Sequence, residues 1–428
     1  MKIRKVSQNF DIEPFKMPLG FKGGYLTGVW QTIVSVETED NFGIGLGTQS
    51  VLWSDADVFS SHSEAGGNAL MFSVTEYASR LLVNREIESP ISFLETYLED
   101  IHSYAKKITG KENLRKTFTL NSLVALDNAL WVLYAKEKGK MDFFEMIPSY
   151  YRETLKYKHS LVACIPLMSY AVPLEDIGKA IKDGFFTLKI KIGSDPEKDG
   201  DREKMLKWDT ERIKSIHERF GDIPTPYTEN GKLPYYFDAN GRYDSKERLW
   251  KLIDFIDKIG ALEMVIIMEE PFPEEMEVDV SEFPVRLVAD ESAHTDEDVV
   301  KRKQMGYKGV ALKPIAKTLS MTLKIVKEAE RMGMDYFCAD LTVIPPLLEW
   351  NKNLASRLKP LPGLKIPVVE SNGHQHYRDW DKLIQKHPYP SAEWVIPFDG
   401  IFHLTSDFYE KSGGIFDVSD YYKSKVRI

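Results

Sequence analysis

Cysteine is nearly absent from this chain, and so are long apolar runs. Only Cys164 and Cys338 occur among 428 residues, and both stand in apolar segments. We expect them to be reduced core residues in a reducing compartment, because disulfide frameworks belong to oxidising ones. No apolar run reaches 18 residues, and the first residues, MKIRKVSQNF, contain no hydrophobic signal segment. These absences favour a cytoplasmic protein that does not bind membranes.

An excess of basic residues is also missing. The chain has 56 Lys and Arg against 65 Asp and Glu, a net charge of -9. Phosphate binding requires a basic face, so this balance argues against nucleic acid as the main partner. A hydrophobic content of 43% and a charged content of 28% are ordinary for a globular protein. The length allows one large domain or two ordinary ones.

The first third of the chain reads as strands followed by helices. TGVWQTIVSVET alternates apolar and polar residues, which is typical of a half-buried strand. In NFGIGLGTQSV the glycines are spaced G-x-G-x-G and no helical pattern follows, which indicates a glycine-rich strand or bulge and not a dinucleotide loop. Helices are predicted over 68–83, 91–108 and 119–138. The pattern predicts a separate α+β domain over residues 1–140.

From about residue 160 short apolar runs alternate with amphipathic helices. This rhythm is typical of parallel strands covered on both faces. Helices are predicted over 175–183, 200–220, 245–259, 295–304, 318–332 and 376–386. With ACIPLMSYAV as the first strand, eight strands are present, which predicts a (β/α)8 TIM-type barrel over residues 160–390. Residues 391–428, rich in aromatics, are predicted to pack back on the N-terminal domain.

Seven of these apolar runs stop on a charged residue. They are FFTLKIKIG, YYFDAN, VIIMEEP, LVADES, VALKP, YFCAD and PVVES. Their charges are roughly 20 to 50 residues apart, the spacing of the strand-helix unit in such a barrel. Parallel barrel strands direct their carboxyl ends to one face, where active sites lie. The sequence therefore predicts one pocket lined by lysines and carboxylates.

Three carboxylates end consecutive predicted strands. Asp238, Glu269 and Asp290 would lie on neighbours about 5 Å apart, close enough to share one ion. Three hard oxygen ligands, with no Cys or His among them, favour Mg2+, or else Mn2+, over Zn2+.

Three lysines share the same predicted face. Lys189 and Lys191 are two apart on one strand and face the same side, whereas Lys313 ends a strand nearly opposite. We expect burial and like charges to lower the pKa of lysines in such a pocket. They could then act as bases near neutral pH, on opposite faces of a substrate.

The motifs K-x-K, DAN, EEP, ADES and a lysine at the sixth strand, in this order, resemble the enolase superfamily, in its muconate-lactonizing-enzyme-like subgroup. SLVALDNALWVLYAKEKGK at 122–140 is similar to an alanine-rich helix of that family. The resemblance runs from about residue 25 to 375. It implies a modified barrel, a capping domain whose two loops close over the substrate, one Mg2+ ion, and removal of a proton α to a carboxylate through an enediolate.

The resemblance also implies roles for single residues. The metal ligands would be Asp238, Glu269 and Asp290. The acid/base pair would be Lys191 and Lys313, with Lys189 supporting charge on the intermediate. Residues next to these, or in contact with substrate, would be Asn240, Glu270, Glu291, Asp340, Glu370, Lys22, Tyr25 and Trp53. The seventh strand lacks the His of mandelate-racemase-like members. The eighth lacks the Asp-x-Asp pair of dipeptide epimerases, and His374 and His376 are either pocket or loop residues.

Three hypotheses for the function remain. The first is a racemase or epimerase of an amino acid derivative or dipeptide-like acid, because two opposed lysines suit proton removal and return. The alternative is a dehydratase or cycloisomerase that uses the same intermediate on a hydroxy acid. The third is a binding protein that has lost the chemistry, which the complete set of acids and lysines disfavours. We expect a small-molecule carboxylate substrate and a homo-oligomer, by family resemblance a dimer or an octamer.

Overall fold

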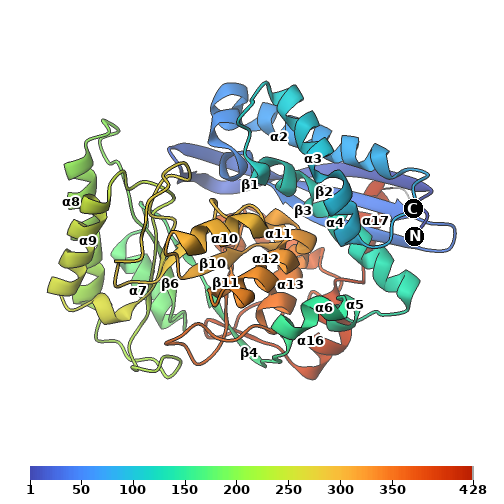
Figure 1. Cartoon of the computed structure of the whole chain (residues 1–428). Helices are drawn as coiled ribbons and strands as arrows, with labels where there is room; N and C mark the ends of the chain where they lie inside the picture. Colours follow the sequence, from blue (N-terminus) through green and yellow to red (C-terminus); the bar gives the residue numbers. More distant parts are fainter. Residues whose placement is uncertain (427–428) are drawn as a thin grey trace.

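The computed structural model describes residues 1–426, which contain two β-sheets and the helices around them (Figure 1). The N-terminal sheet is antiparallel, in the order β1-β2-β3. Its strands are β1 (Lys5–Phe21), β2 (Gly24–Glu37) and β3 (Phe42–Gln49). β1 and β2 form a long hairpin, whose turn at Lys22 and Gly23 has positive φ at both residues.

Helices follow this sheet in the chain, as the sequence predicted. They are α1 (Val51–Ser54), α2 (Ala56–Leu82), α3 (Pro90–Thr109) and α4 (Lys116–Lys138). The predictions for α3 and α4 are confirmed. Helix α2 begins well before residue 68, because the side chain of Asp55 accepts bonds from its first N–H groups. The run SSHSEAGGN conceals this start, since serine and glycine are weak helix formers.

The alternating glycines allow α4 to pack directly on β3. A Cβ atom added to Gly45 would lie 2.1 Å from the carbonyl oxygen of Ala125, and one on Gly43 would lie 2.2 Å from that of Ala129. No side chain larger than hydrogen fits between strand and helix there. The prediction of a glycine-rich strand is confirmed, and the reason for the spacing is close helix packing.

The second sheet has ten strands in the order β13-β4-β12-β11-β10-β9-β8-β7-β6-β5. All its recorded pairings are parallel except that of β13 with β4. The strands are β4 (Leu161–Ile165), β5 (Leu167–Met168), β6 (Leu188–Lys191), β7 (Tyr235–Asp238), β8 (Val265–Glu269), β9 (Leu287–Ala289), β10 (Gly309–Leu312), β11 (Asp335–Cys338), β12 (Val368–Glu370) and β13 (Ile401–His403).

This sheet is curled, but its hydrogen-bonded order is open, unlike the closed ring that the sequence predicted. The first predicted strand is divided at Pro166, which has no N–H to donate to a ladder. Its first half, β4, pairs with β12, and its second half, β5, pairs with β6. The predicted strands are thus present in their expected order, whereas β13 was not predicted.

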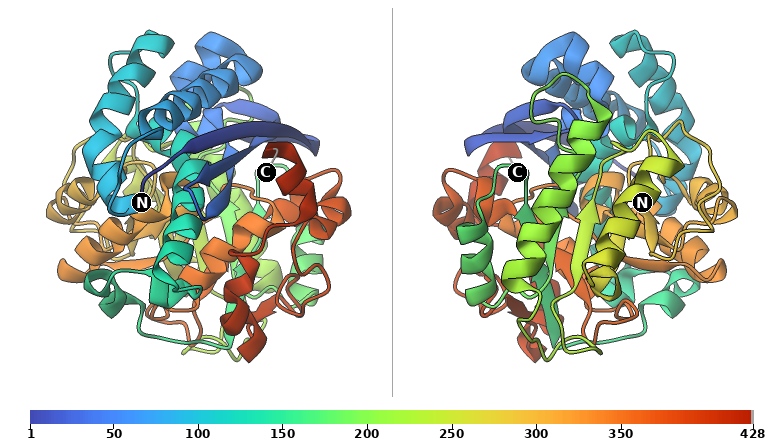
Figure 2. Two further views of the ribbon diagram at one scale, coloured as in Figure 1. Left: turned by 90° about the vertical axis from the view of Figure 1, so that its right-hand side faces the viewer. Right: turned by 90° about the vertical axis from the view of Figure 1, so that its left-hand side faces the viewer.

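Helices cover the outside of the curled sheet, with α8 and α9 side by side (Figure 2). The helices of this part of the chain are α7 (Leu174–Lys182), α8 (Arg202–Phe220), α9 (Lys246–Lys258), α10 (Asp296–Gln304), α11 (Pro314–Lys317), α12 (Leu319–Arg331), α13 (Pro345–Ala355), α14 (Gly373–His376) and α15 (Trp380–Gln385). Of these, α11 and α14 contact the N-terminal part of the chain. The five predictions from 175 to 332 are confirmed. Helix α13 was missed because nearly all its residues are buried, so it shows no polar stripe.

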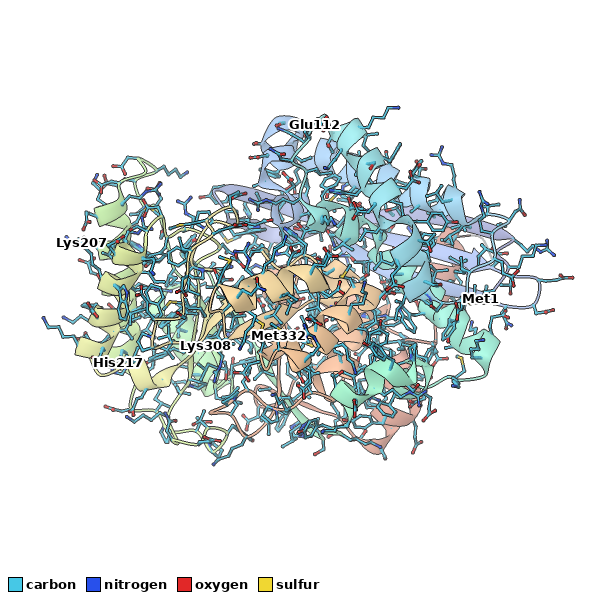
Figure 3. All side chains as sticks on the ribbon, in the orientation of Figure 1. Met1, Glu112, Lys207, His217, Lys308 and Met332 are labelled. Carbon is cyan, nitrogen blue, oxygen red and sulfur yellow. The ribbon has the colours of Figure 1, made fainter. Side chains whose placement is uncertain are left out.

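Short elements complete the chain. After α4 come α5 (Phe143–Met146) and α6 (Ser149–Arg152), and near the end come α16 (Ser406–Lys411) and α17 (Asp420–Val426). Helix α17 lies against β1, where Lys425 Nζ is 2.6 Å from Asp11 Oδ1. Charged side chains such as Lys207 project outward (Figure 3). Within residues 1–426 the structure contains no helix both long and apolar enough to cross a membrane.

We predict that Gly45→Ala destabilises the protein by about 1–3 kcal/mol, because the added methyl group overpacks the contact with α4. Chemical denaturation measures the change. The matched control is Gly66→Ala in α2, where the nearest atom would be 3.5 Å away. It should stabilise by up to about 1 kcal/mol. Equal stability of the two variants would contradict the packing argument.

Candidate active site

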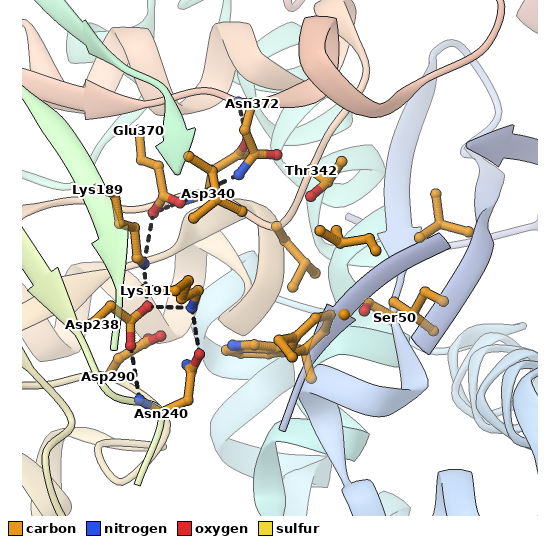
Figure 4. Close-up of a pocket in the computed structure, with 18 of the residues that line it drawn as sticks. Ser50, Lys189, Lys191, Asp238, Asn240, Asp290, Asp340, Thr342, Glu370 and Asn372 are labelled. Atoms are coloured by element: carbon orange, nitrogen blue, oxygen red, sulfur yellow. Dashed lines mark hydrogen bonds and ion pairs between the residues drawn. The ribbon is translucent and has the colours of Figure 1, made fainter. Parts of the chain in front are cut away.

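The charged strand ends meet around one small cavity between the two sheets (Figure 4). Its volume is about 50 Å³, room for a few water molecules, since a buried water needs roughly 10–15 Å³ of such space. The charged and polar lining consists of Lys189, Lys191, Asp238, Asn240, Asp290, Glu291, Lys313, Asp340, Glu370 and Asn372. The N-terminal hairpin supplies an apolar roof of Phe15, Leu19, Phe21, Leu26 and Val29. The site therefore needs both sheets.

Lys189 lies among the buried carboxylates. Its Nζ atom is 2.9 Å from Asp238 Oδ2 and 2.8 Å from Glu269 Oε2. A third oxygen, Glu370 Oε2, is 3.1 Å away. Burial alone would lower the pKa of Lys189, but the surrounding carboxylates together raise it well above its usual value. Lys189 is thus held as an ammonium ion.

The other site lysines are also paired. Lys191 Nζ is 2.5 Å from Asp238 Oδ2 and contacts Asn240 Oδ1. Lys313 Nζ is 2.5 Å from Asp290 Oδ2. Burial would lower the pKa of Lys313, but the charge of Asp290 raises it. The expectation that burial and like charges lower the lysine pKa values is therefore wrong for Lys189 and Lys313 in this arrangement, because carboxylates contact both ammonium groups.

Sequence reasoning missed a fourth buried lysine, Lys317 in α11. Its side chain is fully buried, and its Nζ atom is 2.6 Å from the carbonyl oxygen of Asp290 and 3.3 Å from Asp290 Oδ1. The only signal was its position one helical turn after Lys313, in KPIAK. Tyr236, whose hydroxyl contacts Glu269, was missed because a tyrosine inside an apolar strand looks like core.

Lysines and carboxyl groups contact one another closely in this cluster. Four buried lysines face four buried carboxylates, which are Asp238, Glu269, Asp290 and Glu370. Burial would raise the pKa of Asp238 and Asp290, but their lysine partners lower it below the usual range. At Glu269 burial and the nearby Asp238 charge raise the pKa well above normal. Crowded carboxylates at the strand ends thus depend on nearby cations.

The three predicted metal ligands fit a hard divalent cation by their chemistry. All three are carboxylates, all are buried, and Glu269 Oε1 has no hydrogen-bond partner. As the side chains stand, no three His, Cys, Asp or Glu groups among residues 1–426 are gathered closely enough to hold a metal. Lys189 Nζ lies between Asp238 and Glu269 instead. A cation would have to take over the charge that this ammonium now supplies.

Asp340 and Glu270 have no lysine or arginine partner within 4.0 Å among the described residues. Burial raises the pKa of each to about 7. Asp340 lines the cavity and accepts bonds from the backbone N–H groups of Asn372 and Val343. Glu270 is not part of the cavity lining, and its Oε2 atom accepts a hydrogen bond from the backbone N–H of Asp290 at 2.6 Å. Glu270 therefore orients the end of β9.

The structure separates the predicted loop contacts. Trp53 lines the cavity, and its ring covers Lys313 Nζ at 4.7 Å. Lys22 is turned inward to Glu291, whereas Tyr25 is 54% exposed and borders a neighbouring cleft. His374 and His376 lie in α14, packed near Phe185 and Phe15, and burial lowers the pKa of both to about 4. Neither histidine lines the small cavity.

A wider cleft of about 840 Å³ adjoins the cavity, within the usual range of ligand sites, about 300–1,000 Å³. The two spaces share Leu19, Gly20, Phe21 and Leu167 as walls. Hairpin residues 16–25 and the segments 168–173 and 193–198 border the cleft. A substrate head in the cavity could thus extend into the cleft.

Residues 174–358 match the family model described as enolase C-terminal domain-like. This region belongs to the enolase superfamily. It contains all the charged strand ends from β7 to β11, including the three predicted metal ligands. No curated protein matches the sequence. The predicted family resemblance is therefore confirmed for this region.

Solved structures share the fold over most of this chain. A dipeptide epimerase from Enterococcus faecalis V583, complexed with Mg and L-Leu-L-Tyr, is 18% identical, with 88% of this chain and 100% of that chain covered and a TM-score of 0.61. An N-succinyl Arg/Lys racemase from Bacillus cereus ATCC 14579 is 16% identical, with coverages of 88% and 89% and a TM-score of 0.62. A muconate lactonizing enzyme from Mucobacterium Smegmatis, complexed with muconolactone, is 16% identical, with 94% of each chain covered and a TM-score of 0.61. At this identity the likeness shows the fold alone.

We predict that Lys317→Met destabilises the protein by about 3–5 kcal/mol, because it removes one partner of a buried ion pair and leaves Asp290 undercompensated. Urea unfolding measures the loss. The control is Lys301→Met, because the Lys301 side chain is 67% exposed and its Nζ atom is 3.8 Å from Asp298 Oδ1. Lys301→Met should change the free energy of unfolding by less than about 1 kcal/mol. If both variants were equally stable, the Lys317 ammonium would not be needed.

Proposed function

We propose that this protein is a Mg2+-dependent enzyme that removes a proton α to a carboxylate, with Mn2+ as a possible substitute. The proposed reaction is racemisation or epimerisation of an amino acid derivative or dipeptide-like acid. The observation that carries the proposal is that Lys191 and Lys313 reach one cavity from β6 and from the end of β10. Three strands separate β6 from β10, so the two lysines approach from different sides.

Asp238, Glu269 and Asp290 would hold the metal ion, which would neutralise charge that develops on the substrate carboxylate. Lys189 would support the same charge. Lys313 can accept a proton only after its ammonium has left Asp290 and lost its proton, because that contact raises its pKa. The roof of apolar hairpin residues would exclude water from the reacting carbon.

Lys191 and Lys313 would work as a pair. One removes the α-proton and the other returns a proton to the opposite face, which inverts the centre. The adjoining cleft supports an extended substrate over a compact one. The names of two structural neighbours, a dipeptide epimerase and an N-succinyl amino acid racemase, point to the same class.

A lyase or cycloisomerase is the second candidate, since a muconate lactonizing enzyme shares the fold. A leaving group β to the carboxylate would be expelled after proton removal by the same lysines. We further propose the domain division given by the sequence, with a capping domain over 1–140, a barrel over 160–390 and a segment over 391–428 that returns to the cap. The contact of Lys425 with Asp11 supports this return. A cytoplasmic homo-oligomer stays our expectation.

We predict that the protein with Mg2+ in D2O exchanges and inverts the α-proton of N-succinyl-phenylalanine or Ala-Phe epimers. Lys191→Ala and Lys313→Ala should each lower inversion about 100-fold or more, because each lysine serves one face. NMR and chiral chromatography follow both outcomes, with exposed Lys207→Ala as the control. Loss of water without inversion, on β-hydroxy acids, would favour the lyase. If α-proton exchange persisted in the variant that lacks both Lys191 and Lys313, the racemase and the lyase hypotheses would both be contradicted.

We predict that Mg2+ binds and that Asp290→Asn weakens binding at least tenfold, equivalent to about 1.4 kcal/mol. The change removes one of three carboxylate charges at the proposed ion. Isothermal titration calorimetry with Mg2+ alone measures the affinity. Asp296→Asn, in the first turn of α10, is the control and should bind as the wild type does. If Asp290→Asn bound Mg2+ as tightly as the wild type does, Asp290 would not be a metal ligand.

A further inference from the structure

The tip of the β1–β2 hairpin carries a lysine that is turned inward. Lys22 has a φ of 48°, and Gly23 follows with a φ of 75°. The Lys22 side chain is only 8% exposed, although hairpin tips usually face solvent. Its Nζ atom is 3.2 Å from Glu291 Oε1 and 3.0 Å from the carbonyl oxygen of Trp53. Lys22 thus joins the hairpin tip to Glu291, which lines the cavity.

The contact continues from Glu291 toward Lys191. Glu291 Oε1 also accepts a hydrogen bond from Asn240 Nδ2 at 3.0 Å. On its other side Asn240 Oδ1 accepts from Lys191 Nζ, a contact visible in Figure 4. A side-chain amide has a donor end and an acceptor end. Because Glu291 takes the donor end, the acceptor end must face Lys191.

The backbone supports this orientation. Asn240 has a φ of 43°, a conformation that few residues other than glycine adopt. Its N–H donates to Asp238 Oδ1 at 3.0 Å, which fixes the side chain above Lys191. Among the described residues Lys313 donates to Asp290 and not to Glu291 or Asn240. Its link to Lys22 runs only through Trp53, whose ring covers Lys313 and whose carbonyl oxygen accepts from Lys22.

We infer that Lys22, Glu291 and Asn240 form a hydrogen-bonded relay that positions Lys191 when the hairpin lies over the cavity. The inference rests on the proposed function. The hairpin lines both the cavity and the adjoining cleft, so its movement would widen the entry for an amino acid derivative. When the hairpin moves away from the cavity, the Lys22 ammonium separates from Glu291, and only Glu291 and Asn240 remain in contact with one another and with Lys191. Closure would therefore align one of the two bases.

The first test follows backbone amide hydrogen exchange by mass spectrometry and needs no substrate. Lys22→Met should speed exchange at least threefold at residues 16–25 and also at 239–242, which the relay connects to Lys22. The control is Lys16→Met on the same hairpin, whose ammonium bonds to the carbonyl oxygen of His374. It should leave 239–242 unchanged. Unchanged exchange at 239–242 in Lys22→Met would overturn the relay.

The second test uses the two enantiomers of N-succinyl-phenylalanine, with Mg2+ in D2O. Glu291→Ala should lower α-proton exchange of one enantiomer at least tenfold more than that of the other. A merely structural role would lower both equally, and that result would overturn the inference. Lys22→Met should act in the same direction with a lower kcat, and Lys22→Arg should restore it. If the wild type exchanges neither enantiomer, the proposed function fails for this substrate class, and the amide test alone decides the relay.

Discussion

The structure depends on buried ion pairs between lysines and carboxylates at the ends of parallel strands. Removing an ion from water costs several kcal/mol unless opposite charges and hydrogen bonds compensate. Here each of Lys189, Lys191, Lys313 and Lys317 contacts a carboxylate. Such a cluster tolerates a new cation only if an ammonium moves away or loses its proton. In the proposed reaction, a metal ion that took the place of an ammonium group would leave that lysine available as a base.

The N-terminal sheet matters as much as the curled one. Its hairpin places an apolar roof over the charges, which lowers the local dielectric and strengthens every ion pair beneath it. It also brings Lys22 down to Glu291. A long hairpin with a left-handed tip is suited to move as a unit, because its own ladder keeps β1 and β2 together. The hairpin therefore supplies both the apolar roof over the cavity and the ammonium group of Lys22 next to Glu291.

Much of the fold could be predicted because its signals are local. Amphipathic helices α8, α9, α10 and α12 show their periodicity directly, and strand runs ending in charge mark the face of the site. Elements without such a signal were missed. Buried α13 has no polar stripe, and β13 pairs with β4 from about 240 residues later in the chain. Pro166 was visible in the sequence, but its effect on strand pairing appears only when the neighbouring strands are in place.

The sequence by itself determined which charged groups reach the site and in which strand order, because strand alternation fixes the side that each residue faces. Only the tertiary structure decided how those charges pair. The pKa of Lys189 and Lys313 rises and does not fall, since the carboxylates that contact them come from other strands. Lys317, the roof and the link from Lys22 to Lys191 likewise depend on distances between segments far apart in the chain. Such distances follow from packing, to which no local pattern of residues gives access.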